Sequence, residues 1–116
     1  MDDVKLLTAA IRKKLLANGA NSDQDHAPVV KFFNPAGGQT WLVSEMDEDG
    51  DTLFGLCDLG MGEPELGNLS LSELAGIRTR FGLGIERDLW FTATAPMSKY
   101  ADAARKVGRI IEDVEA

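Results

Sequence analysis

The chain has little cysteine, histidine or proline: one Cys, one His and four Pro in 116 residues. A single cysteine, Cys57, excludes an internal disulfide, which is typical of a reducing compartment. One Cys and one His also cannot supply the four ligands of a structural zinc site. No apolar run approaches the roughly 20 residues that cross a bilayer. The acidic start, Met1-Asp2-Asp3, does not resemble a signal peptide. We therefore expect a cytoplasmic protein that makes no membrane contact.

Positive charge is scarce as well. Twelve Lys and Arg residues stand against nineteen Asp and Glu residues, so the net charge is −7. Proteins that bind nucleic acid through its phosphates need an excess of Lys and Arg, and general nucleic-acid binding is therefore not expected. The hydrophobic content of 44% is enough for one core. A chain of this length corresponds to a single domain over residues 1–116.

Three segments have the apolar periodicity of helices. The first is expected from Asp3 to about Ala17 and ends before Asn18-Gly19. The second is short and follows a capping box that starts at Ser70 and places Glu73 three residues later. The third is C-terminal, with Ser98 expected as its N-cap. Its apolar stripe comprises Tyr100, Ala103, Ala104, Val107, Ile110, Ile111 and Val114.

Between the first two helices the residues are typical of strands. Strands are expected over residues 29–33, 40–46 and 52–57, with a short one at 66–71 and a last one at 86–92. The pair Asp49-Gly50 favours a type I′ hairpin turn. The sequence therefore predicts an α+β fold, in which an antiparallel β-meander packs against an N-terminal, a short central and a C-terminal helix.

The predicted strands are apolar on both faces. Val30 and Phe32 point one way, and Val29 and Phe33 point the other way. A sheet with one solvated face alternates apolar and polar residues instead. Either a helix and the glycine-rich segment cover the second face, or that face is left open for a partner.

No catalytic motif is complete. Cys57 lies in an apolar strand beside Asp58, whose charge would raise the thiol pKa, so a structural role is expected. The glycine pairs at 60–62 and 82–84 do not complete a phosphate loop. We assign no catalytic residue. The alternative is a carboxylate-based site near the glycine-rich loop at 58–67, and its candidates are Asp58, Glu63, Glu65 and Glu73.

Residues 47–51 are similar to the start of an EF-hand loop, with Asp47, Asp49 and Asp51 at the first three ligand positions. The similarity then ends. Thr52 stands where the loop needs glycine, and Asp58 stands where it needs glutamate. We expect a solvated acidic hairpin tip, with weak cation binding as the alternative. No metal site and no cofactor are predicted.

The chain also resembles a known family along nearly its whole length. The most specific stretch is Phe54-Gly55-Leu56-Cys57-Asp58-Leu59-Gly60-Met61-Gly62, followed by residues 64–67. Shorter matching stretches are 15–19, 28–35, 40–42, 71–74 and 86–88. This pattern resembles the bacterial "domain of unknown function 2958" family. The resemblance implies small cytoplasmic proteins, often carried by plasmids or phages, and it implies no reaction and no catalytic residues.

These observations favour a non-enzymatic module that binds a bacterial protein on behalf of a mobile element, with counter-defence as the suggested purpose. Trp41 and Trp90 are the candidate interface anchors, because tryptophan is enriched in binding hot spots. The acids expected to steer association are Asp47, Glu48, Asp49 and Asp51. The alternative is a small enzyme that uses the carboxylates named above. The sequence gives no oligomeric state.

Overall fold

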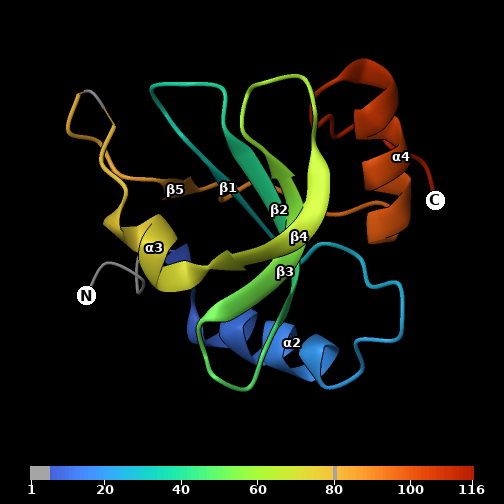
Figure 1. Ribbon diagram of the computed structural model, residues 1–116. Helices are drawn as coiled ribbons and strands as arrows, with labels where there is room; N and C mark the ends of the chain where they lie inside the picture. The colour runs from blue at the N-terminus through green and yellow to red at the C-terminus, as the bar shows by residue number, and fades with distance from the viewer. Residues whose placement is uncertain (1–5, 80) are drawn as a thin grey trace.

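Five strands form one antiparallel sheet in the order β4-β3-β2-β1-β5 (Figure 1). The computed structural model describes residues 6–79 and 81–116. The strands are β1 (Val30–Phe33), β2 (Thr40–Met46), β3 (Thr52–Asp58), β4 (Glu65–Ser70) and β5 (Glu86–Arg87). The helices within the described residues are α2 (Ala9–Gly19), α3 (Leu71–Gly76) and α4 (Met97–Val107). The predicted α+β fold with an antiparallel sheet and three packed helices is confirmed.

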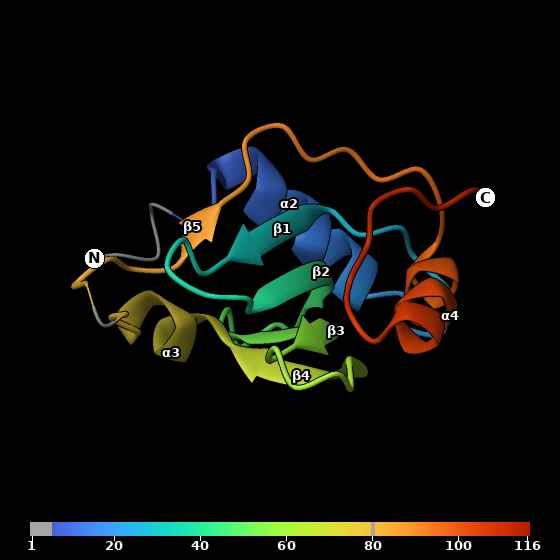
Figure 2. The ribbon, with the colours of Figure 1, turned by 90° about the horizontal axis from the view of Figure 1, so that it is seen from above.

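Each face of the sheet carries its own hydrophobic core. Trp41, Val43 and Leu53 belong to one core with residues of α2 and α3. Leu42 and Leu56, which alternate with them along the strands, belong to a second core with α4. Figure 2 shows α3 and α4 on opposite sides of the sheet. The second face is therefore covered, which explains why both faces of the strands are apolar. Its cover is α4 with the segments before and after it, not the glycine-rich segment expected beside a helix.

In the described residues, the predicted N-terminal helix corresponds to α2. Thr8 is the N-cap of α2, and its hydroxyl accepts a hydrogen bond of 3.1 Å from the amide of Ile11. The predicted start of this helix, at residues 3–5, lies outside the described residues. The helix ends at Gly19, where a Cβ atom would come within 2.0 Å of the carbonyl oxygen of Met46. Only glycine therefore allows α2 to lie this close to β2.

The C-terminal helix differs from the prediction at both ends. It begins at Met97, and Ser98 is not its N-cap. Instead, the Asp25 carboxylate accepts hydrogen bonds from the amide and the hydroxyl of Ser98. The helix ends at Val107 because Gly108 adopts a left-handed conformation, with φ of 87°. Residues 109–116 then fold back without helical structure, although the apolar side chains among them still pack against the second core.

Two turns also differ from the prediction. The β2–β3 hairpin is not type I′, since Gly50 has a φ of 75° but no described residue other than glycine has a positive φ. The last strand ends at Arg87 rather than residue 92. After it, the Asp88 carboxylate accepts a hydrogen bond of 2.8 Å from the amide of Trp90, which turns the chain away from β1. In the part of the chain that is described, no helix is long and apolar enough to span a membrane.

The two tryptophans should differ sharply in their effect on stability. Trp41 is 6% exposed and Trp90 is 91% exposed. We expect Trp41→Ala to lower the free energy of unfolding by about 3–5 kcal/mol, as removal of a large core side chain does. Trp90→Ala should change it by no more than about 0.5 kcal/mol. Urea denaturation of both variants checks this, and equal losses would contradict the assignment of Trp41 to the core.

Candidate functional site

The outer edge of β4 borders a hollow of about 400 Å³ that extends to α3. Among the described residues, no strand pairs with β4 on its outer side. The apolar side chains lining the hollow come from β2, β3, β4 and the region of α3: Trp41, Cys57, Leu66, Leu69, Leu74 and Ile77. A Cβ atom at Gly67 would meet nothing within 4 Å, so the hollow is open above this position. We call this hollow the β4 groove.

Two exposed carboxylates, Glu65 and Glu73, also line the β4 groove. Neither forms an ion pair with another described residue. The Cys57 thiol faces the same hollow, and burial raises its pKa. The thiol therefore stays protonated at neutral pH and is a poor nucleophile. The chemistry of the groove is that of an apolar surface with negative charge beside it.

The four carboxylates proposed near the glycine-rich loop do not form one site. Glu65 and Glu73 share the β4 groove, and Glu63 is exposed outside it. Asp58 is 4% exposed and points to the opposite face of the sheet. Its two oxygens accept hydrogen bonds from the amides of Gly60, at 2.9 Å, and Ile110, at 3.0 Å. Asp58 therefore joins the end of β3 to the C-terminal segment.

Two of the hairpin acids form hydrogen bonds within the protein. One Asp49 oxygen accepts from the amides of Asp51 and Thr52, both at 2.8 Å, and the other accepts from the Thr52 hydroxyl. Asp51 accepts from the Ser70 hydroxyl and the Ser72 amide, both at 2.8 Å, at the start of α3. These hydrogen bonds lower the pKa of both carboxyl groups. The two acids therefore fix the turn and tie it to α3.

The remaining hairpin acids, Asp47 and Glu48, are exposed. Within the described residues, no three Asp, Glu, His or Cys side chains are arranged to hold a metal ion. The steering role expected of residues 47–51 stays a prediction.

The proposed tryptophan anchors do not share a surface. Trp41 is part of the first core and contributes one wall of the β4 groove. Trp90 lies just after β5, at the opposite edge of the sheet from β4, and Leu89 beside it is 70% exposed. Trp41 is therefore too buried to act as a protruding anchor, whereas Trp90 is available to a partner.

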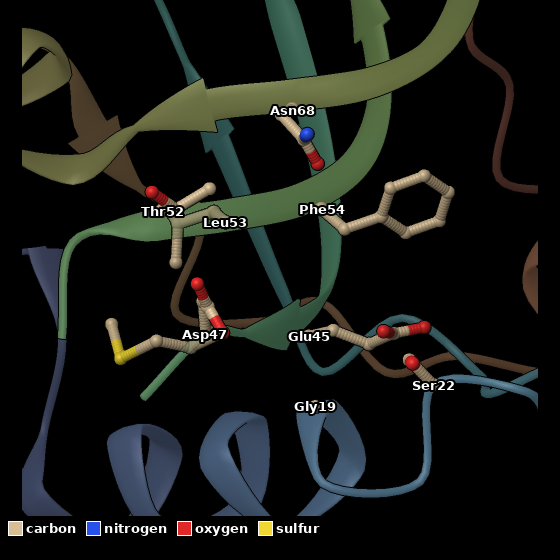
Figure 3. Close-up of a pocket in the computed structure, with 9 residues that line it drawn as sticks. Gly19, Ser22, Glu45, Asp47, Thr52, Leu53, Phe54 and Asn68 are labelled. Atoms are coloured by element: carbon tan, nitrogen blue, oxygen red, sulfur yellow. The ribbon is translucent and has the colours of Figure 1, made fainter. Parts of the chain in front are cut away.

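A second hollow, of about 380 Å³, lies where β2 and β3 meet the end of α2 (Figure 3). It adjoins another of about 270 Å³ that reaches the start of α4. Both are lined by Ser22, Glu45 and Phe54. We call the two hollows together the Glu45 cleft.

A β-bulge places Glu45 in this cleft. The β2–β3 register shifts between Val43 and Glu45, so Ser44 is an extra residue, and its carbonyl accepts a 2.9 Å hydrogen bond from the Asn18 side chain. Glu45 then stands opposite Phe54 on the same face. In the sequence nothing distinguished Glu45 from the other acids except its position, with Ser44, inside an otherwise apolar strand.

Glu45 is a buried residue whose carboxylate accepts no hydrogen bond from the described residues. It is 9% exposed and makes no hydrogen bond or ion pair with a described residue. Burial raises its pKa, and the nearby His26 lowers it to a smaller extent. A buried acid with a raised pKa beside a cleft is a candidate functional group, because folding alone gains nothing from it.

The fold and these hollows define a small α+β protein whose sheet is covered on both faces and has an open edge strand. A family model described as "Protein of unknown function (DUF2958)" matches residues 6–111, so the chain belongs to that family. Neither a curated protein nor a solved structure matches the chain.

The raised pKa of Glu45 predicts how stability depends on pH. Between the ordinary carboxyl pKa of 4.5 and the raised value, the folded state binds more protons than the unfolded state. The contribution of Glu45 to the free energy of unfolding is therefore fully present below pH 4.5, and it is lost as the pH rises through the raised pKa. We expect Glu45→Gln to remove this dependence and to melt at least as high as the wild type at pH 7.

Thermal melts between pH 4 and pH 8 test this prediction. Glu86→Gln is the matched control, because Glu86 is an exposed glutamate on β5. It should reproduce the wild-type profile. A marked loss of stability in Glu45→Gln at pH 7 would mean that the carboxylate forms a stabilising contact.

Proposed function

We propose that this protein is a non-enzymatic binding module that holds an extended segment of a bacterial protein along β4. The observation that carries the proposal is the open outer edge of β4 next to an apolar groove. An edge strand presents unpaired amide and carbonyl groups, and an extended peptide can add to them as a further strand. Apolar side chains of that peptide would then enter the groove.

The β4 edge has few of the features that usually prevent such pairing. Protected edges carry lysine, proline or a bulge. The six residues of β4 include no lysine and no proline, and their register with β3 is continuous from Glu65 to Ser70. The only charge on the strand is Glu65, at its first position. Nothing in the strand itself therefore opposes the addition of another one.

The charges around the groove specify the chemistry of the partner. Glu65 and Glu73 favour a basic side chain next to the apolar ones, and the net charge of −7 favours a basic partner overall. We therefore propose an extended segment that alternates apolar residues with Lys or Arg. The exposed acids of the β2–β3 hairpin would accelerate its association at low salt.

The biological setting is a proposal as well. We propose that the protein acts in the cytoplasm for a plasmid or phage and counters a bacterial defence by binding one of its proteins. The single cysteine supports the cytoplasmic location, and the mobile-element setting is supported by what the family resemblance implies. The alternative of a carboxylate enzyme near residues 58–67 has less support, because Asp58 faces away from Glu65 and Glu73.

Filling the groove should abolish binding without unfolding the protein. Gly67 has open space above it and no positive φ, so Gly67→Phe places a ring in the groove without backbone strain. Linear peptides selected from a random phage-displayed library against the wild type should alternate apolar and basic residues. They should bind Gly67→Phe at least about tenfold more weakly, a loss of roughly 1.4 kcal/mol.

Gly38→Phe is the matched control, because Gly38 also has open space above it but lies in the β1–β2 loop. It should bind the selected peptides like the wild type. Equal binding by Gly67→Phe and the wild type would overturn the proposal. A selection that yields no peptide sensitive to Gly67→Phe would overturn it as well.

A further inference from the structure

The Glu45 cleft and the β4 groove are different hollows that adjoin at Leu66 and Asn68, which line both. The groove is lined by Trp41, Cys57 and α3, whereas the cleft lies between β2, β3, the end of α2 and the loop that follows α2. Glu45 and Phe54 are paired in register, and Figure 3 shows both side chains extending to the same side. The main hollow, of about 380 Å³, is within the size range of small-ligand sites.

The electrostatics of the cleft exclude several classes of ligand. Asp47 lines one hollow with Glu45. In the other, Asp23, Asp25 and Glu45 outnumber the single imidazole of His26, so an anion would be repelled. A purely apolar ligand would leave the Glu45 charge buried without compensation. A metal ion lacks a ligand set, since no three suitable side chains converge in the described part of the chain.

An organic cation satisfies each of these conditions. An ammonium or guanidinium group can pair with the carboxylate of Glu45, a residue that is 9% exposed and accepts no hydrogen bond from a described residue. The face of the Phe54 ring can attract the same cation. Ser22 and Asn68, which also line the hollow, offer hydroxyl and amide oxygens to its remaining N–H groups.

We infer that the Glu45 cleft is a binding site for an organic cation that carries an ammonium or guanidinium group. The group can belong to a free amine or to a Lys or Arg side chain of a protein. In either case Glu45 supplies the countercharge and Phe54 the apolar contact.

Two probes carry a guanidinium group. Agmatine represents a free amine, and N-acetyl-arginine methylamide represents an arginine side chain of a protein. Butylurea is the neutral analogue. Titrations are followed by amide NMR shifts at pH 7, with shifts expected at Ser22, Glu45 and Phe54 and none with butylurea. Glu45→Gln should weaken binding at least about tenfold, as expected for loss of a charge-assisted hydrogen bond.

Glu86→Gln and Gly67→Phe are the controls, and both should bind the probes like the wild type. The second control separates this site from the β4 groove, because a failed groove proposal leaves these titrations unchanged. Binding of agmatine alone assigns the site to a free amine, and equal binding of the blocked arginine assigns it to a protein side chain. Binding that survives Glu45→Gln, equal binding of butylurea, or no shifts at about 10 mM of either probe would overturn the inference.

Discussion

Burial of the sheet on both faces is the constraint on which the other features of this protein depend. With α2 and α3 on one face and α4 on the other, the strands must be apolar on both sides. The sheet then has only its edges and strand ends to offer to solvent. The β4 groove lies at an edge, and the Glu45 cleft lies where β2 and β3 meet the end of α2. Both candidate sites therefore lie where the helices leave the edge or the ends of the strands uncovered.

Aspartate carboxylates hold the layers together at three points. Asp25 accepts hydrogen bonds at the start of α4, Asp51 joins the hairpin to the start of α3, and Asp58 joins β3 to the amide of Ile110. Each acid satisfies backbone amides that lack a partner at a helix start or in an irregular segment. Part of the acidic composition is therefore structural. Glu45 differs from these acids because it accepts no hydrogen bond from a described residue, and the charge of the nearby His26 offsets its burial only in part.

The sequence predicted what depends on local pattern and missed what depends on tertiary contact. Strand β2 was predicted with its exact bounds, and the Ser70 cap of α3 was predicted with its partner residue. The end of α4 was missed because the apolar stripe continues past Gly108, whose left-handed conformation alone stops the helix. The sequence did not distinguish buried Trp41 from exposed Trp90, or Glu45 from the other acids. The β-bulge and the covering helices decide which of these side chains reach solvent.

The two sites are adjacent along β4 but lie on different faces. Gly67 lines only the groove, whereas Asn68 lines both the groove and the main hollow of the cleft, and Leu66 lines both the groove and the smaller hollow. Successive residues of a strand point to opposite faces, so an occupant of each site meets β4 from its own face, with Leu66 and Asn68 as the shared border. A ligand couples two sites only if it has different affinities for two states of the protein. The Asn18–Ser44 hydrogen bond and the continuous β3–β4 register hold the end of α2 and the strands together. Any coupling between the groove and the cleft should therefore pass through the side chains of Leu66 and Asn68, which line both.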